Sequence, residues 1–267
     1  MKPFQTTIGG ARLAGEEAGM GECVVMLHAG VADRRMWRDT MLALSPNHRT
    51  VSYDRRGFGE TATPDEDFSH VDDLAAVLDW LDCARATLVG CSQGGRVAID
   101  FALARPERVG RLILVASAVT GAAPPASYPP DVAVLLAELD DAESRGDLDR
   151  VNAIEAHLWL DGPTSREGRV EGAKRALFLD MNGKALRHPP LTQERAALSA
   201  LDGLGEIVAP TLVIVGDLDF PHLRARAREI AATIPRAKAV AMAGCAHLPS
   251  LESPEAFNQI VAGFLGP

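Results

Sequence analysis

Short apolar runs alternate along this chain with segments of helical periodicity. Residues 23–28, for example, form a continuous apolar run, which is typical of a strand buried on both faces of a parallel sheet. Strands that alternate with helices at these lengths build βαβ units. The expected strands are residues 23–28, 49–54, 86–89, 109–115, 210–216 and 237–242. We therefore predict an α/β fold with a parallel, doubly wound sheet.

A hairpin and an insertion interrupt this alternation. Gly9 and Gly10 separate two short strand-like segments and predict an antiparallel hairpin at the sheet edge. From about residue 121 to about residue 205 there is no buried-strand run, and a Pro-rich linker leads into helical periodicity at 132–142, 148–160 and 166–181. A Thr164-x-x-Glu167 capping box is expected to open the last of these helices. We predict a core of residues 1–120 and 206–267 with a helical cap inserted at 121–205.

The charge of the chain excludes several classes of partner. Asp and Glu number 36 against 27 Lys and Arg, which gives a net charge of −9. Nucleic-acid backbones and anionic membranes require clustered basic residues instead. The N-terminus lacks the apolar run of a signal peptide, and no stretch approaches the ~20 apolar residues of a membrane span. We expect a cytoplasmic protein with neither nucleic-acid nor membrane partners.

Metal and cofactor binding are not predicted. The four cysteines, at positions 23, 83, 91 and 245, lack Cys-x-x-Cys spacing, and no His or carboxylate cluster has the spacing of metal ligands. No phosphate-binding glycine motif surrounds residues 90–95. The cysteines are expected to be small buried apolar residues.

The segment Gly90-Cys91-Ser92-Gln93-Gly94 joins an expected strand to an expected helix. A Gly-x-Ser-x-Gly turn in this context is a nucleophile elbow, which holds the serine oxygen clear of the sheet at a helix N-terminus. Cys91 is expected to turn inward. The alternative is a glycine-rich turn used only for close packing. The five-residue motif therefore indicates a nucleophile only together with catalytic partners elsewhere in the chain.

A serine nucleophile requires a base, and the base requires a carboxylate that fixes its tautomer. In a parallel sheet these groups lie on loops after later strands, in the order serine, acid, histidine. His247 is the histidine that follows the last expected strand. Two aspartates, Asp217 and Asp219, follow the preceding strand, and both remain candidates for the acid.

The attacked carbonyl becomes an oxyanion that needs two N–H donors. The backbone N–H of Gln93, next to the nucleophile, is the expected first donor. The second is expected from the loop after residues 23–28, where Gly30 is the first choice and Val31 the alternative. His28 is expected to brace this loop by hydrogen bonds.

Taken in order, these motifs resemble those of the α/β-hydrolase superfamily over nearly the whole chain outside the insertion. The resemblance lies in His28-Ala29-Gly30, Asp54-x-Arg56-Gly57-x-Gly59, the elbow at 90–95, Gly216-x-x-Asp219 and Gly244-x-x-His247. It implies an eight-stranded, mostly parallel sheet, a helical cap after the sixth strand, and Asp219 as the triad acid. Ala29 and Thr61 stand where the family usually has glycine and serine.

The resemblance implies a carboxylesterase or lactonase that acts on a small, partly apolar molecule without a cofactor. Ser92 in the elbow argues against the dehalogenases and epoxide hydrolases of the family, which use aspartate there. A carbon–carbon bond hydrolase, a perhydrolase-type member and a receptor with slow hydrolysis remain alternatives, as do a monomer and a homodimer. Core packing is the alternative for Trp37 and for the residues of the insertion among those expected at the substrate pocket. The residues expected there are Val31, Trp37, Trp159, Leu160, Phe178, Leu179, Met181 and Leu248.

Overall fold

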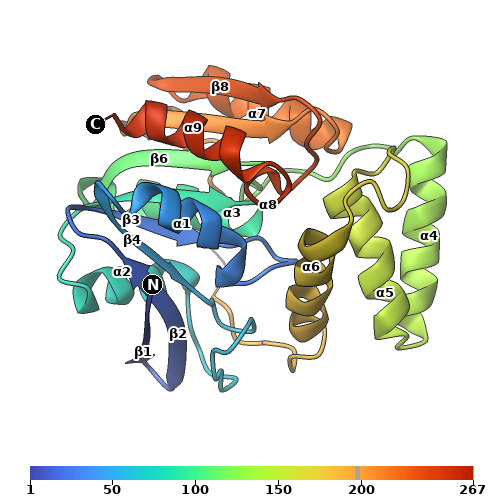
Figure 1. Cartoon of the computed structure of the whole chain (residues 1–267), viewed down its shortest axis with the longest axis horizontal. Coiled ribbons are helices and arrows are strands. Elements are labelled where there is room, and N and C mark those ends of the chain that lie inside the picture. The colour runs from blue at the N-terminus through green and yellow to red at the C-terminus, as the bar shows by residue number, and fades with distance from the viewer. Residues whose placement is uncertain (196–198, 267) are drawn as a thin grey trace.

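The computed structural model describes residues 1–195 and 199–266, which contain one eight-stranded sheet (Figure 1). The strand order is β1-β2-β4-β3-β5-β6-β7-β8. β2 is antiparallel to β1 and β4, and every other neighbouring pair is parallel. The bounds are β1 Lys2–Ile8, β2 Ala11–Ala18, β3 Glu22–Leu27, β4 His48–Tyr53, β5 Ala86–Cys91, β6 Val109–Val115, β7 Thr211–Gly216 and β8 Ala237–Met242. The predicted mostly parallel eight-stranded sheet is confirmed.

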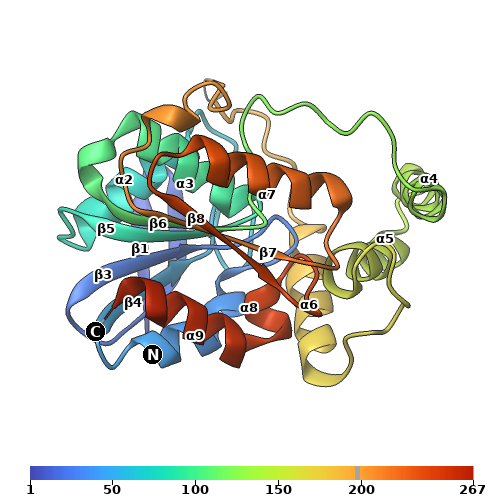
Figure 2. The same cartoon turned by 90° about the horizontal axis from the view of Figure 1, so that it is seen from above.

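Helices cover both faces of the sheet. Figure 2 shows α2, α3 and α7 on one face and α1, α8 and α9 on the other. Their bounds are α1 Arg38–Leu44, α2 His70–Trp80, α3 Gln93–Ala104, α7 Pro221–Thr233, α8 Pro249–Glu252 and α9 Pro254–Leu265, with short 3₁₀ turns η1 Arg34–Trp37, η2 Pro106–Arg108 and η4 Leu204–Glu206. α2 begins directly after Ser69, whose side chain caps the helix by accepting the N–H groups of Val71 and Asp72.

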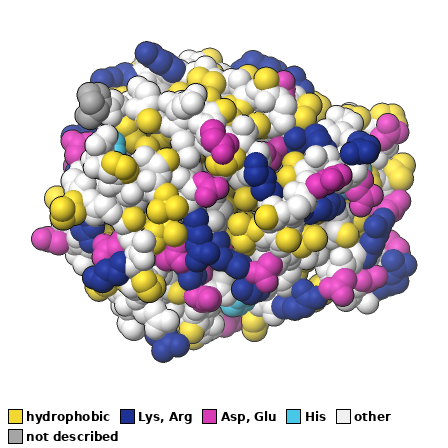
Figure 3. Space-filling view, in the orientation of Figure 1, with side chains coloured by type: hydrophobic (Ala, Val, Ile, Leu, Met, Phe, Trp, Pro, Cys, Tyr) yellow, Lys and Arg dark blue, Asp and Glu magenta, His cyan; other side chains and the backbone are white. Residues whose placement is uncertain are grey.

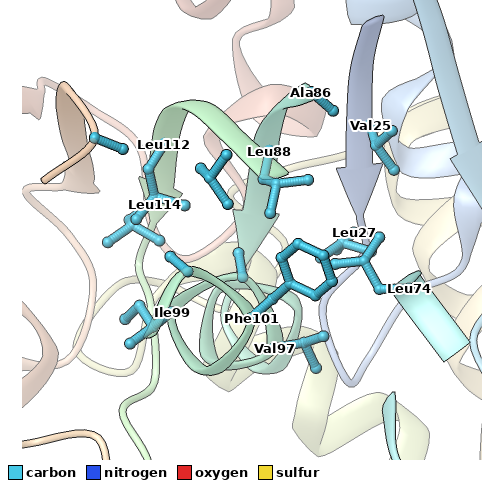
Figure 4. Close-up of a cluster of buried hydrophobic side chains, with 14 of the residues drawn as sticks. Val25, Leu27, Leu74, Ala86, Leu88, Val97, Ile99, Phe101, Leu112 and Leu114 are labelled. Atoms are coloured by element: carbon cyan, nitrogen blue, oxygen red, sulfur yellow. The ribbon is translucent and has the colours of Figure 1, made fainter. Parts of the chain in front are cut away.

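The core follows from the two-sided burial of the strands. Figure 4 shows side chains of β3, β5 and β6 packed against Val97, Ile99 and Phe101 of α3. Phe101 is fully buried. Since apolar burial contributes roughly 25 cal/mol per Å², this layer anchors α3, and with it the turn from which α3 starts.

The segment between β6 and β7 carries the helices α4 Pro130–Ser144, α5 Leu148–Glu155 and α6 Gly172–Ala185, with a single π-helical turn, η3 Ala156–Asp161, after α5. Figures 1 and 2 show these helices gathered to one side of the sheet. We call α4, α5, η3 and α6 the helical insertion. The predicted range 121–205 includes residues 196–198, which lie outside the described residues.

One helix start differs from the sequence prediction. The prediction that a capping box at Thr164 and Glu167 opens the helix is wrong. α6 begins at Gly172, and the residues before it form turns. The Asp161 carboxylate accepts the N–H groups of Gly168 at 2.8 Å and Val170 at 2.9 Å. Gly168 and Gly172 have φ of 76° and 67°, a conformation that interrupts a right-handed helix. Tertiary contacts to Asp161 therefore override the local capping signal.

Candidate active site

Ser92 lies on a tight turn between β5 and α3, as the sequence predicts. Its backbone has φ 52° and ψ −115°, a conformation that residues other than glycine rarely adopt. A Cβ atom on Gly94 would lie 2.2 Å from the carbonyl oxygen of Leu27, and one on Gly90 would lie 2.4 Å from that of Gly94. Glycine is therefore required on both sides of Ser92, and the half-buried serine is held at the N-terminus of α3.

Asp219 and His247 form a buried pair. His247 Nδ1 lies 2.9 Å from Asp219 Oδ2, and both side chains are 2 % exposed or less. The neighbouring parallel strands β7 and β8 bring them together, since each residue lies in the loop after one strand. The other carboxylate oxygen accepts the N–H of Phe220 at 2.8 Å. The carboxylate requires a proton on Nδ1, which leaves Nε2 free to act as a base.

Asp217 takes a different role. Its Oδ1 accepts the backbone N–H of Gly244 at 2.8 Å, and its own N–H bonds to the carbonyl oxygen of Met242 at 3.1 Å. It therefore ties the loop after β7 to the loop after β8. Of the two aspartates that the sequence left open, the structure pairs Asp219 with the histidine.

The Ser92 turn and the His247 loop meet at Cys91. The Cys91 thiol donates to the carbonyl oxygen of His247 at 3.6 Å. Cys91 is fully buried, as expected for a side chain that turns inward. This burial raises the pKa of the thiol well above its usual value, so the thiol stays neutral. No hydrogen bond joins Ser92 Oγ to His247 Nε2 within the described residues. In free enzymes such bonds are often long and shorten when substrate binds.

The expected oxyanion donors lie side by side. A Cβ atom on Gly30 would lie 2.6 Å from the side chain of Gln93. The N–H groups of Gly30, Val31 and Gln93 have no acceptor among the described residues. Gly30, Val31 and Gln93 thus remain candidates for the donors that a developing negative charge needs.

His28 braces the oxyanion loop, as expected. Its Nε2 accepts the backbone N–H of Arg55 at 3.0 Å, so Nδ1 carries the proton and donates to the carbonyl oxygen of Ala29 at 2.7 Å. Burial, assisted by the nearby Arg55, lowers the pKa of His28 well below its usual value. A neutral His28 therefore fixes the loop without taking part in proton transfer.

Five of the expected pocket residues belong to the packed interior. All five have 0 % exposure and lie in one hydrophobic cluster: Trp37, Leu160, Phe178, Met181 and Leu248. Side chains without accessible surface cannot line an open cavity, so these five are packing residues. Trp159 is half-buried, and its ring centre lies 4.7 Å from that of His247. For Trp159, Val31 and the partly buried Leu179 the pocket stays a prediction.

Sequence reasoning missed Glu252, which holds the loop around His247. Its two carboxylate oxygens accept the N–H groups of Ala246 at 2.8 Å and Leu248 at 3.0 Å, the residues on either side of the histidine. Burial raises the pKa of Glu252, and these N–H donors together with Arg169 oppose the rise. The Glu252 side chain is only 2 % exposed and pairs with Arg169 of the segment between η3 and α6.

Arg169 links the helical insertion to this loop. It donates to the carbonyl oxygens of Leu160 at 2.8 Å, Asp161 at 2.6 Å and Gly244 at 2.8 Å. The π-helical turn that contains Leu160 also carries Trp159, whose carbonyl oxygen accepts the His247 N–H at 3.3 Å. Single π-helical turns are frequent at functional sites. The insertion and the histidine loop are thus joined by direct hydrogen bonds.

The described residues contain no helix that is both long and apolar enough to cross a bilayer. Within the same residues, no three His, Cys, Asp or Glu side chains are grouped so that they could hold a metal ion. Basic and acidic side chains are interspersed on the face shown in Figure 3. This face therefore lacks the continuous basic surface that a nucleic-acid backbone would require.

Comparison with known proteins agrees with this geometry. Residues 24–260 match the model of the alpha/beta hydrolase family. The 2-hydroxy-6-oxo-6-phenylhexa-2,4-dienoate hydrolase of Comamonas testosteroni is 31% identical over 260 residues, which cover 93% of this chain and 89% of that protein.

Solved structures show the same fold. The esterase RhEst1 from Rhodococcus sp. ECU1013 superposes with a TM-score of 0.78 at 22% identity, over 99% of this chain and 98% of that one. The enol-lactonase from Burkholderia xenovorans LB400 gives a TM-score of 0.76 at 23% identity, over 98% of this chain and 99% of that one. Because the family model matches most of this chain, the chain belongs to the alpha/beta hydrolase family and is a hydrolase.

Proposed function

We propose that this hydrolase cleaves a carboxylic ester or a lactone through an acyl-enzyme on Ser92. The observation that carries the proposal is the buried 2.9 Å hydrogen bond between His247 and Asp219 beside an elbow that presents a serine. The esterase and the enol-lactonase of the same fold support it, because both names describe hydrolysis at an acyl carbon.

In this mechanism Ser92 Oγ attacks the substrate carbonyl carbon while His247 Nε2 takes the hydroxyl proton. The carbonyl oxygen becomes an oxyanion, which the N–H groups of Gly30 and Gln93 stabilise. His247 then gives its proton to the leaving alcohol, and the bond between the acyl carbon and that oxygen breaks. Water attacks the acyl-enzyme with His247 as base, which releases the acid and restores Ser92.

The helical insertion acts as a cap that selects the substrate. Trp159 contacts the His247 ring and also lies 4.9 Å, between ring centres, from Phe220 next to the triad acid. An aromatic wall at this position favours a partly apolar acyl or alcohol group. The sheet supplies only the reacting groups, so differences in specificity arise from the insertion.

Hydrolysis of a carbon–carbon bond beside a ketone is the second candidate. The Comamonas relative, at 31% identity, is named for a 6-oxo-dienoate substrate. The same serine, histidine and oxyanion donors are available to either reaction. The two candidates differ in the bond that breaks, and substrate panels therefore separate them.

The proposal is tested by covalent labelling and turnover. A fluorophosphonate is expected to add one phosphonyl group, and mass spectrometry of the digested protein is expected to place it on Ser92. Turnover is then measured on aryl esters, aliphatic esters, lactones and a 6-oxo-dienoate. Turnover of the dienoate alone would favour the second candidate. Labelling with tight binding but almost no turnover would favour the receptor alternative, and labelling at another residue would overturn the mechanism.

Arg169→Met is expected to lower kcat by about 10–100-fold with a smaller change in KM, because a small displacement of a catalytic group costs rates of this order. The substitution leaves the buried Glu252 carboxylate without its cation and releases the carbonyl oxygens around His247. Steady-state kinetics on an aryl ester measures the effect. The control is Arg166→Met in the same segment, whose side chain is 82 % exposed. An unchanged kcat in folded Arg169→Met protein would contradict the positioning role.

A further inference from the structure

Arg55 is a buried cation that has no carboxylate partner among the described residues. It is 1 % exposed, and its Nε and Nη1 atoms lack any hydrogen-bond acceptor there. Nη2 reaches only neutral oxygens, the His28 carbonyl at 3.2 Å and Gln93 Oε1 at 3.4 Å. Burial lowers the pKa of Arg55 to about 10, so the guanidinium remains charged at neutral pH. A buried charge without a partner is costly and calls for an explanation.

Neighbouring arginines show what a charge-paired guanidinium looks like here. Arg56, the next residue, pairs with Asp73 at 2.8 Å and Glu66 at 2.7 Å. Arg34 pairs with Asp54 and with Glu60. The lack of a partner is therefore specific to Arg55 and is not a general property of this part of the fold.

Arg55 lies behind the wall of a cavity of about 440 Å³. Its guanidinium carbon is 4.7 Å from the ring centre of Phe58, which lines the cavity together with Gln93. The remaining wall comes from Arg56 and Gly57 beside Phe58, from α3, from the start of α2 and from residues within 185–194, which lead back from the insertion. Gln93, the residue after Ser92, is thus part of the cavity wall.

The charges around this cavity leave a positive excess. Arg96 pairs with Glu194 at 3.1 Å, and both side chains are partly exposed, so the pair is weak. Arg56 is balanced by its own carboxylates. Burial, followed by the nearby arginines, lowers the pKa of His70 well below its usual value, so His70 is neutral. Arg55 has only neutral oxygens and the face of Phe58 as partners, so its charge makes the cavity locally positive in a chain whose net charge is −9.

Gln93 both lines the cavity and contacts Arg55. Its side chain is exposed, and its Oε1 accepts a single long hydrogen bond of 3.4 Å from Arg55 Nη2. Rotation of this amide would uncover Nη2 and remove the neutral oxygen that now faces it. A carboxylate oxygen at that place would form a shorter, charge-assisted hydrogen bond.

We infer that this cavity binds a carboxylate at the end of the substrate's acyl chain, held by Arg96 and by Arg55 once the Gln93 amide turns aside. The inference rests on the proposed function and narrows its substrate class to esters or lactones whose acyl part is anionic. The acyl part stays on Ser92, beside Gln93, through both steps of the reaction, so its charge can be held throughout.

Paired substrates test this inference. The 4-nitrophenyl half-esters of succinate, glutarate and adipate are compared with the neutral butanoate, pentanoate and hexanoate esters of equal chain length. For at least one pair, we expect the anionic ester to have a kcat/KM about tenfold higher, even though the net charge of the chain repels anions. Added NaCl is expected to reduce this preference. A preference for the neutral ester in every pair would overturn the inference.

Three variants locate the effect. Arg96→Met and Arg55→Met are each expected to lower the anionic-to-neutral ratio about tenfold. Glu194→Gln is expected to raise the ratio, because it frees Arg96. Arg105→Met is the control, since Arg105 lies at the end of the same helix, is exposed and pairs with Asp72. A ratio that is unchanged in both Arg96→Met and Arg55→Met would overturn the inference.

A binding measurement separates this inference from the proposed function. Calorimetric titration of Ser92→Ala protein with glutarate and with pentane-1,5-diol needs no turnover. We expect glutarate to bind at least about tenfold more tightly than the diol, and Arg96→Met to remove the difference. Glutarate binding without hydrolysis of any ester would contradict the proposed function but not the carboxylate site. Ester hydrolysis through Ser92 with no preference for glutarate would contradict the carboxylate site but not the proposed function.

Discussion

Ser92→Ala protein is expected to lose ester hydrolysis by a factor of about 10⁵ or more in kcat, the size of effect seen when a triad nucleophile is removed. The variant retains the oxyanion donors and the binding surface, which together leave only a small residual rate above that of water. Because alanine adopts the φ of 52° at this turn no less readily than serine, the fold is expected to be preserved. Burst kinetics with a 4-nitrophenyl ester measures the loss.

A neighbouring substitution is the matched control. Cys91→Ser keeps a hydrogen-bond donor toward the His247 carbonyl oxygen, which the thiol now contacts at 3.6 Å. Its kcat is expected to stay within about tenfold of the original enzyme, since Cys91 faces the interior. Full activity in Ser92→Ala, or a loss in Cys91→Ser as large as that expected for Ser92→Ala, would contradict a serine nucleophile at position 92.

The central strands could be predicted because they are buried on both faces. The runs at 109–115 and 237–242 coincide with β6 and β8 to the residue, although three of the six β8 residues are exposed and two are only partly buried. The order of these strands places the loops after β7 and β8 side by side. This makes His247 a candidate in the sequence, together with Asp217 and Asp219, between which only the family resemblance favours Asp219. The position of these loops follows from the strand order and depends little on how individual side chains pack.

The contacts that position the site could not be predicted in the same way. Glu252 reaches Arg169 across 83 residues, and such a pair leaves no periodic signal. The turn at 156–161 has the apolar pattern of an ordinary helix, and its π-helical form is accompanied by hydrogen bonds from Arg169 to its last carbonyls. The start of α6 differs from the prediction for a related reason, since Asp161 accepts the N–H groups of Gly168 and Val170 and holds the preceding residues in turns.

Arg55 is a residue that the sequence motif does not point to. The Asp54-x-Arg56-Gly57-x-Gly59 pattern draws attention to Arg56, which the structure finds fully paired. Arg55 occupies a position that the pattern leaves free. Its burial and its missing partner depend on how the loop lies against β5 and α3, which only the three-dimensional structure gives.

Asp219→Asn is expected to lower kcat by about 10⁴, with KM changed far less, because the loss occurs in the transition state. An asparagine amide that donates toward His247 would favour the tautomer with its proton on Nε2, and that nitrogen could not then accept a proton from Ser92. The bond from the Phe220 N–H at 2.8 Å can persist through the amide oxygen, so stability is expected to change little.

Asp217→Asn provides the comparison, two residues away on the same loop. Its amide oxygen can still accept the Gly244 N–H, now at 2.8 Å from the carboxylate, so kcat is expected to stay within about tenfold. Thermal melting of both variants checks that the loop remains folded. If Asp217→Asn lost activity and Asp219→Asn kept it, the acid would be Asp217, and the buried pair with His247 would have only a structural role. The two kinetic measurements thus decide between aspartates that the sequence alone left open.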